Sequence, residues 1–246
     1  MITAHLFTQE NTTAPIYSAR TDMPTIKFTT EAQLVNLFEG IFDRNISKNS
    51  TGLLAEFECG DGIADIVLYE LRKGWKNALV LGELPPRWVY ALHKLPYRRN
   101  FTTDDFVLRT SVTRNTALQI LDSYTKLGFC ERKNKTDTWL KTKQPRQLVN
   151  QIYAVEAKLR HWKKALTQAV RYRDYATQSW VLLDKHSIKP AVENIEQFKR
   201  LNIGLAAIAT SGDISTYLTP KPLAPKSDLR FWQANAEIAR NLFLRL

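Results

Sequence analysis

The sequence has little of what stabilises secreted or membrane proteins. Only two of its 246 residues are cysteines, Cys59 and Cys130, and they form no Cys-x-x-Cys pair. We therefore expect neither a disulfide framework nor a zinc site. No apolar run approaches the roughly 18–20 residues needed to cross a bilayer. The first 30 residues contain no basic segment followed by an apolar core, so we expect no signal peptide and a cytoplasmic protein.

Other absences narrow the chemistry. No Gly-rich phosphate loop is present, which argues against intrinsic ATP-driven translocation. The four histidines show neither metal-ligand spacing nor a triad grouping and stand at His5, His93, His161 and His186. The rest of the composition is that of a globular protein, and 246 residues suffice for one large domain or two modest ones.

Positive charge is what the sequence has in excess. Lys and Arg number 35 against 24 Asp and Glu, which gives a net charge of +11 and an isoelectric point near 9.6. Such a surface attracts polyanions, most simply nucleic acid. An anionic membrane is the competing partner, and the absence of a long apolar run counts against it.

Hydrophobic periodicity divides the chain into segments of different pattern. Residues 1–30 are polar and irregular and are expected to form an arm. Residues 31–83 and 148–246 combine strands with helices, which predicts one discontinuous α/β (α+β) domain whose sheet is flanked by helices. Residues 84–147 contain helices and one short hairpin and form an inserted domain. The expected helices are 31–44, 87–94, 103–110, 114–127, 160–176, 190–201 and 229–245, and the expected strands are 53–58, 63–71, 129–133, 138–142, 152–158, 179–184, 203–209 and 213–218.

An acid and a base stand two positions apart in the apolar run at 152–158. Side chains of a strand alternate between its faces, so Glu156 and Lys158 point the same way while Val155 and Ala157 point into a core. A carboxylate beside an ammonium on an apolar strand is costly unless the pair has a partner or a task. A half-exposed edge strand with a simple ion pair is the alternative.

A second acid, Asp65, begins the apolar strand at 63–71, directly after a Gly-rich turn. It either caps that turn or serves chemistry. Together with Glu156 and a strand carbonyl it can hold Mg²⁺ or Mn²⁺, which prefer oxygen ligands. A water acidified there, with Lys158 orienting it or stabilising charge, can attack a phosphodiester. The two acids are 91 positions apart, and a domain inserted between their strands would account for this distance.

The helix expected at 160–176 carries a polar pair and a basic rim. Gln168 and Tyr172 are four residues apart and therefore share one face. The rim, which suits phosphate groups, consists of Lys163, Lys164, Arg171 and Arg173. A solvated helix face with a glutamine at its boundary is the alternative.

These residues resemble the motifs of the PD-(D/E)xK nuclease superfamily, which has the restriction-endonuclease-like fold. Asp65 matches its metal-binding aspartate, and residues 156–158, Glu-Ala-Lys, match its acid-x-Lys motif. Residues 168–172 are similar to the Gln-x3-Tyr motif of the RecB-like exonuclease branch. Ala64 stands where the eponymous proline would be, which makes the motif less specific.

The resemblance covers roughly residues 31–83 and 150–218 and implies a mixed central sheet, a Mg²⁺ or Mn²⁺ cofactor and nuclease activity. The implied metal ligands are Asp65, Glu156, the main-chain carbonyl of Ala157 and one acid of the first helix, Glu39 or, less favoured, Glu31. Lys158 would position or help deprotonate the attacking water. Gln168 and Tyr172 would support the site or the strand.

The inserted segment at 84–147 resembles a winged helix-turn-helix domain, because three helices are followed by a small hairpin. Between Arg98 and Arg146 there are 11 Lys and Arg against 5 Asp and Glu. Ser111 or Thr113 would cap the recognition helix. The residues expected to contact DNA are Arg114, Asn115, Thr116 and Gln119 on this helix, Arg132, Lys133, Lys135 and Lys141 on the wing, and Lys163, Lys164 and Arg171 on the later helix. A winged helix that contacts protein is the alternative.

The sequence therefore predicts a Mg²⁺-dependent DNA nuclease whose winged-helix domain holds duplex DNA. A setting in bacterial defence or mobile-element biology rests on analogy alone. The first alternative is a non-catalytic DNA-binding regulator that keeps the nuclease fold as a scaffold, and the second is an RNA-processing or protein-interaction factor. Cutting both strands with one site per chain would require a homodimer. The nuclease reading requires the carboxylates of Asp65 and Glu156 to converge.

Overall fold

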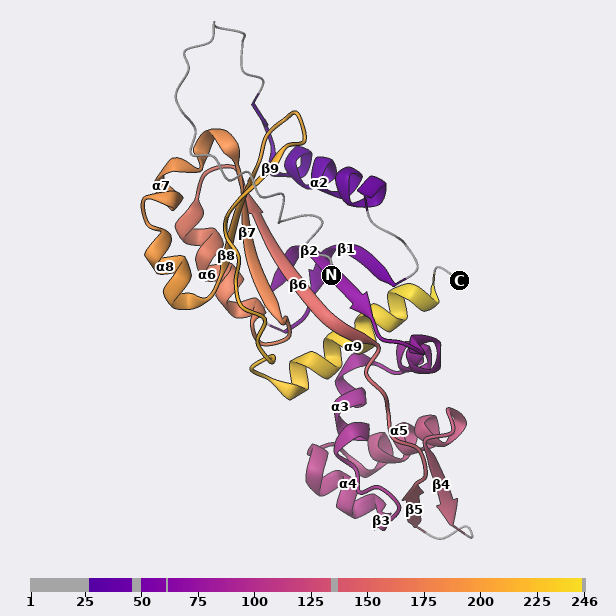
Figure 1. The fold of residues 1–246 in the computed structure, drawn as a ribbon. Coiled ribbons are helices and arrows are strands. Elements are labelled where there is room, and N and C mark those ends of the chain that lie inside the picture. Colours follow the sequence, from indigo (N-terminus) through magenta and orange to yellow (C-terminus); the bar gives the residue numbers. More distant parts are fainter. Residues whose placement is uncertain (1–26, 46–49, 61, 134–136, 245–246) are drawn as a thin grey trace, which may run out of the picture. The chain divides into compact units, whose positions relative to one another are not determined.

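The chain divides into two compact units, and each unit is built from two stretches that are distant in sequence (Figure 1). The first unit comprises residues 1–71 and 150–226, and the second comprises residues 72–149 and 227–246. The computed structural model describes residues 27–45, 50–60, 62–133 and 137–244. The arm expected at 1–30 therefore lies almost wholly outside the described residues. None of the described helices combines the length and apolarity that a membrane crossing requires.

A six-stranded mixed sheet forms the centre of the first unit, in the order β1-β2-β6-β7-β8-β9. Antiparallel pairs stand at its two ends, β1 with β2 and β8 with β9, while β6, β7 and β8 pair in parallel. The strands span Thr51–Glu58 (β1), Ile63–Leu71 (β2), Val149–Lys158 (β6), Gln178–Asp184 (β7), Gly204–Ile208 (β8) and Ile214–Leu218 (β9). The expected α/β architecture with a helix-flanked sheet is thus confirmed.

Helices cover both faces of this sheet. Helix α2 (Glu31–Asn45) begins directly after Thr30, whose hydroxyl accepts a hydrogen bond from the Gln33 amide. It packs Leu34 and Phe38 onto one face, against Val155 and other core residues. Helices α6 (Trp162–Tyr172), α7 (Lys189–Val192) and α8 (Ile195–Leu201) cover the other face, and a short 3-10 turn, η2 (Lys185–Ser187), precedes α7.

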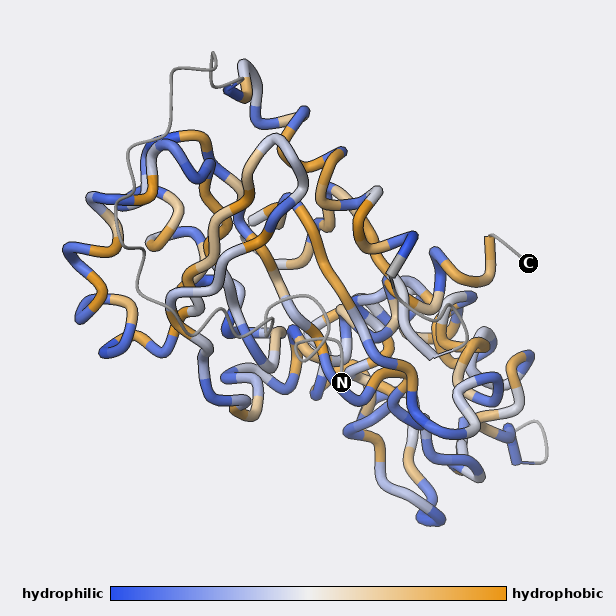
Figure 2. Tube along the Cα trace, turned by 45° about the horizontal axis from the view of Figure 1, so that its top comes forward, coloured by the Kyte–Doolittle hydropathy of each residue, from blue (hydrophilic) through white to orange (hydrophobic). Residues whose placement is uncertain are grey.

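Burial on both faces explains the nearly continuous apolar runs of the central strands. Every residue of β7 is buried, and these strands are among the most hydrophobic segments of the chain (Figure 2). The helix expected at 190–201 is divided in two at Glu193 and Asn194. A periodic pattern alone does not reveal such a break, because both halves bury the same face.

The second unit contains helices and a three-stranded sheet in the order β3-β5-β4. Its elements are η1 (Trp75–Glu83, a 3-10 helix), α3 (Pro86–Lys94), β3 (Asn100–Thr102), α4 (Thr103–Thr110), α5 (Arg114–Lys126), β4 (Cys130–Lys133), β5 (Thr138–Lys141) and α9 (Asp228–Phe243). Helices and hairpin follow the sequence expectation closely, while η1 and the three-residue β3 were not expected.

The C-terminal helix α9 belongs to this second unit, although the sequence pattern assigned it to the discontinuous α/β domain. It packs against η1 and α3, and Trp232 stacks on His93 of α3 with ring centroids 4.5 Å apart. Asn235 is fully buried and its Oδ1 accepts hydrogen bonds from the amides of Leu148 and Val149. A Cβ at Gly82 of η1 would lie 2.7 Å from the carbonyl carbon of Ala239, so the two elements approach closely only because this residue is glycine.

Candidate functional site

The two acids singled out from the sequence meet on neighbouring strands. Strands β2 and β6 are adjacent in the sheet, and the amide of Ala157 donates a hydrogen bond of 2.7 Å to Oδ2 of Asp65. Nζ of Lys158 lies 3.4 Å from the same Asp65 oxygen and 2.8 Å from Oε1 of Glu156. Both carboxylates therefore approach one atom, the ammonium nitrogen of Lys158.

Strand alternation determines which side chains take part. Val155 and Ala157 pack into the core beneath α2, as expected, so Glu156 and Lys158 point to the opposite face. Strand β6 lies between β2 and β7, and Glu156 is 0% exposed. The alternative of a half-exposed edge strand is wrong, because this acid and base lie in the interior of the sheet.

Four oxygens surround the ammonium of Lys158. Besides Asp65 and Glu156, they are the carbonyl of Ala157 at 3.0 Å and Oε2 of Glu31 at 3.2 Å. Burial by itself would lower the pKa of Lys158, but the adjacent carboxylates outweigh this effect and raise it. The ammonium is therefore held charged among oxygens that include those expected to bind a metal.

Tyr172 fixes Glu156 from the opposite side. Its hydroxyl contacts Oε2 of Glu156 and lies 2.7 Å from the carbonyl oxygen of Ile63. A hydroxyl has one hydrogen, so it can donate to only one of these oxygens at a time. Burial and the nearby Asp65 raise the pKa of Glu156, against the opposing effect of its hydrogen bonds to Lys158 and Tyr172. Helix α6 is in this way tied to β2 and β6 at the site.

Gln168, one turn before Tyr172, does not complete this network. Its Oε1 is buried and has no hydrogen-bond partner among the described residues. The shared helix face predicted for the two residues is consistent with α6, which spans both. The three basic residues of this helix that were expected to contact DNA, Lys163, Lys164 and Arg171, are exposed to solvent.

The donor atoms suit a hard cation in type. Asp65, Glu156 and the Ala157 carbonyl supply only oxygen, the ligand that Mg²⁺ and Mn²⁺ prefer. Among the described residues there is no group of three or more His, Cys, Asp or Glu able to hold a metal ion, so the carbonyl would have to serve as the third ligand. Glu31 is the acid of α2 that contacts Lys158, whereas the pKa of the favoured candidate, Glu39, is raised by burial and by Asp43.

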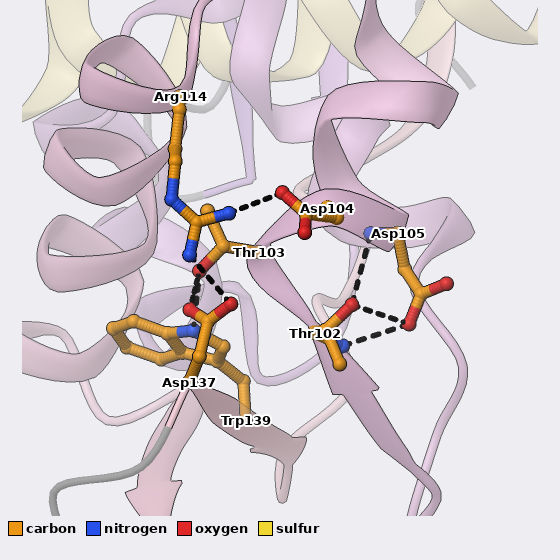
Figure 3. A network of polar contacts seen from close by, with 7 residues as sticks. All are labelled: Thr102, Thr103, Asp104, Asp105, Arg114, Asp137 and Trp139. Atoms are coloured by element: carbon orange, nitrogen blue, oxygen red, sulfur yellow. Dashed lines mark hydrogen bonds and ion pairs between the residues drawn. The ribbon is translucent and has the colours of Figure 1, made fainter.

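Part of the surface expected to contact DNA is occupied within the second unit. Arg114, at the start of α5, forms ion pairs with Asp104 of α4 and, at 2.8 Å, with Asp137 beside β5 (Figure 3). Thr103 donates to Asp137 and accepts a hydrogen bond from the indole of Trp139. Arg114 is exposed to solvent, but it already forms ion pairs with two carboxylates, and these contacts link α4, α5 and the hairpin.

The cap of α5 is Thr113, since its hydroxyl accepts a hydrogen bond from the amide of Thr116. Ser111 instead ends α4, in a left-handed conformation. The hydroxyl of Thr116 bonds to that of Thr113 at 2.9 Å, so it belongs to the cap. Asn115 and Gln119 remain exposed on this helix.

Lys141, which was expected to contact DNA from the hairpin, is buried and therefore not available on the surface. It is 0% exposed, and its ammonium donates to the carbonyls of Leu92 and His93 and to the side chain of Gln144. These carbonyls belong to the last turn of α3, so Lys141 caps the C-terminal end of that helix. Burial lowers the pKa of Lys141 to about 8. Of the other expected hairpin cations, Arg132 and Lys133 are exposed, and Lys135 lies outside the described residues.

The net charge of the chain resides entirely in the second unit. This unit contains 19 Lys and Arg against 8 Asp and Glu, whereas the first unit contains 16 of each. The excess of Lys and Arg between Arg98 and Arg146 was already visible in the sequence, and the division of the structure into units assigns the rest of the net charge to the same unit. The first unit is balanced in charge, and the second unit carries the whole excess of +11.

Comparison with known proteins gave no match: no family model, curated protein or solved structure is significantly similar to this chain.

Proposed function

We propose that the chain is a metal-dependent nuclease that hydrolyses phosphodiester bonds of DNA. The observation that carries this proposal is the convergence of Asp65, Glu156 and Lys158, which come from two strands that are adjacent in space but distant in sequence. A buried acid and base without chemistry would be a costly arrangement, since well-packed apolar residues of similar volume are often at least as stable.

The arrangement of the first unit supports a restriction-endonuclease-like fold. In this fold a hairpin is followed by the strand with the acid-x-Lys motif, and a helix then leads to a parallel strand. Strands β1, β2 and β6, helix α6 and strand β7 follow one another in this way, with the long segment 72–149 between β2 and β6. This order of elements supports the proposal of a restriction-endonuclease-like fold.

The second unit supports the inserted winged helix. Its elements α3, β3, α4, α5, β4 and β5 follow the order helix, strand, two helices and hairpin, and β5 lies between β3 and β4. We propose that α5 approaches duplex DNA with Asn115 and Gln119, and that Arg132 and Lys133 contact phosphates beside it.

Each residue of the cluster has a role in the proposed reaction. Asp65, Glu156 and the carbonyl of Ala157 would hold Mg²⁺ or Mn²⁺, which supplies an acidified water as nucleophile. Lys158 would orient that water or stabilise charge on the phosphate, and Tyr172 keeps the carboxylate of Glu156 in place. Because Lys158 contacts the same oxygens, its ammonium must move away from Asp65 and the carbonyl when they bind a cation.

A non-catalytic DNA-binding regulator is the second candidate. It is favoured by the same contacts of Lys158, because an ammonium that satisfies all the acids makes a stable structural cluster without a metal. In that case the first unit would be a scaffold, and the positively charged second unit would perform the function.

A cleavage assay separates the two candidates. Plasmid, linear duplex and single-stranded DNA would be incubated with Mg²⁺ or Mn²⁺ and with wild type, Asp65→Asn, Lys158→Met or the control Glu196→Gln, an exposed acid of the same unit. We expect cutting by wild type and the control and none by the two site variants. If wild type binds DNA but cuts it with neither metal, the nuclease proposal is wrong and the non-catalytic regulator is the remaining candidate. Double-strand cuts whose rate rises with the square of protein concentration would indicate a homodimer.

A further inference from the structure

A basic groove lies on the second unit, apart from α5 and the hairpin tip. It consists of two adjoining hollows of about 360 Å³ and 390 Å³ that share Ala78 and Arg146. Arg72 and Lys73 line one hollow, and Lys143 lines the other. The cations come from the turn before η1 and from the segment after β5, so two distant stretches of sequence build one surface.

Among the described residues, no acid lines either hollow and none forms an ion pair with these four cations. In the part of the chain that the structure describes, no carboxylate forms an ion pair with Arg72, Lys73, Lys143 or Arg146, and all four are exposed. Arg72 donates to the neutral amide of Gln147. This differs from Arg114, which is held between two aspartates. The groove thus contributes four cations without paired acids to the positive charge of the second unit.

Aromatic side chains accompany the cations. Trp75 lines one hollow and Tyr97 the other, and Tyr97 is 39% exposed. Lys143 lies over the ring of Phe129, with Nζ 5.6 Å from its centroid. Cations that follow a backbone, interleaved with rings on which bases can stack, are the usual components of a surface for a nucleic-acid strand.

We propose that this groove binds the sugar-phosphate backbone of nucleic acid as a second contact, separate from α5. Lys143 follows β5 at its C-terminal end, whereas Asp137 and the start of α5 lie at the opposite end of this strand. Four strand residues separate the two ends by roughly 10–13 Å. Because phosphate contacts carry no base information, the groove adds affinity without sequence preference.

The inference shares its class of partner with the proposed function but does not depend on cleavage. Binding is therefore measured in EDTA by fluorescence anisotropy, with a labelled duplex and a single strand of the same sequence. The variants are Lys73→Ala/Arg146→Ala, the charge-conserving Lys73→Arg/Arg146→Lys, and the control Lys221→Ala/Lys226→Ala, which removes two exposed cations from the first unit.

Each phosphate contact contributes about 0.9 to the slope of log affinity against log salt for duplex and about 0.7 for a single strand. We expect the alanine pair to lower this slope by nearly 2 and to weaken binding by roughly tenfold per lost contact at 0.1 M salt, while the other two pairs stay near wild type. Of the duplex and the single strand, the one whose affinity falls more in the alanine pair is the one that the groove binds.

Equal slopes for the alanine pair and the control would overturn the inference, as would a loss that the charge-conserving pair does not restore. The result is distinguishable from failure of the nuclease proposal. A change in the salt slope without any cutting would support binding in the groove and contradict the nuclease proposal. Cutting with unchanged slopes would support the nuclease proposal and contradict binding in the groove.

Discussion

The amide of Ala157 donates to the carboxylate of Asp65 across 2.7 Å, although 92 positions of sequence separate them. This hydrogen bond joins two strands of the sheet at the point where Lys158 meets three carboxylates. It orients Asp65 toward the ammonium, so the amide and the ammonium together hold one carboxylate oxygen. The geometry of the cluster therefore depends on the pairing of β2 with β6.

Replacing Lys158 by methionine should destabilise the first unit. Glu156 would remain fully buried without its cation, and breaking a buried ion pair in this way costs about 3–5 kcal/mol. We expect urea unfolding monitored by circular dichroism to show this loss, with Lys164→Met, an exposed lysine of α6, close to wild type. An effect below about 1 kcal/mol would mean that Glu156 is neutral in the folded protein.

The same variant tests the metal proposal without activity. If Mg²⁺ or Mn²⁺ binds the oxygens that Lys158 occupies, removing the ammonium should increase metal affinity even though catalysis is lost. We expect isothermal titration calorimetry to give tighter Mn²⁺ binding for Lys158→Met than for wild type, and none for Asp65→Asn. Equal Mn²⁺ binding by all three proteins would place the ion elsewhere.

Lys141 should make the stability of the second unit depend on pH. Its pKa is lowered from 10.5 to about 8 by burial, so the unfolded chain binds more protons between these values and stability rises with pH from about 8. Cys130, whose pKa burial raises from 9.0 to about 12, acts in the opposite direction above pH 9. We expect thermal unfolding between pH 7.5 and 9 to show the rise in wild type and not in Lys141→Met.

Neutralising the acids around Arg114 should strengthen nucleic-acid binding. In Asp104→Asn/Asp137→Asn the guanidinium is free to contact a phosphate, and two repulsive charges are removed. We expect a steeper salt dependence and a several-fold gain in affinity, compared with Glu193→Gln/Glu196→Gln, which removes two exposed acids of the first unit. Weaker binding than this control would show that the network is needed to shape the surface.

Two glycines should respond oppositely to alanine. At Gly82 the new Cβ would meet the backbone of Ala239 at 2.7 Å, so we expect a loss of about 1–3 kcal/mol from strain between η1 and α9. At Gly40, inside α2, nothing lies within 4 Å, so we expect a gain of about 0.5–1 kcal/mol from helix propensity. Chemical denaturation of both variants measures these shifts.

Local patterns predicted most of the secondary structure. Each cap, at Thr30 and at Thr113, is made by residues only three positions apart, and each periodic face of α2, α5 and α6 repeats every three to four residues. The sequence alone therefore contains these signals. The three-residue β3 and the 3-10 helix η1 depend on packing partners far along the chain and gave no such signal. The side of α9 that is buried was readable from its periodicity, but its partners, η1 and α3, were not.

The candidate site was predictable in its residues and less so in their environment. Asp65, Glu156 and Lys158 were identified by type and spacing, and Tyr172 by its position on the helix. The exposure of Arg114 and Lys141 could not be predicted, because their charge is consistent with either a solvent-facing or a buried role. Tertiary contacts decided between them: Arg114 is exposed and paired with two aspartates, whereas Lys141 is buried under the last turn of α3.

The sequence by itself determined which residue types alternate along the strands and helices, and thus that Glu156 and Lys158 share one face. Only the tertiary structure decided that this face is buried, that Asp65 and Glu31 join it, and that all the net charge lies in the other unit. The physical reason is range. Periodicity and capping depend on residues close together in the sequence. Which charged side chains meet depends on strand pairing and packing between segments about a hundred residues apart.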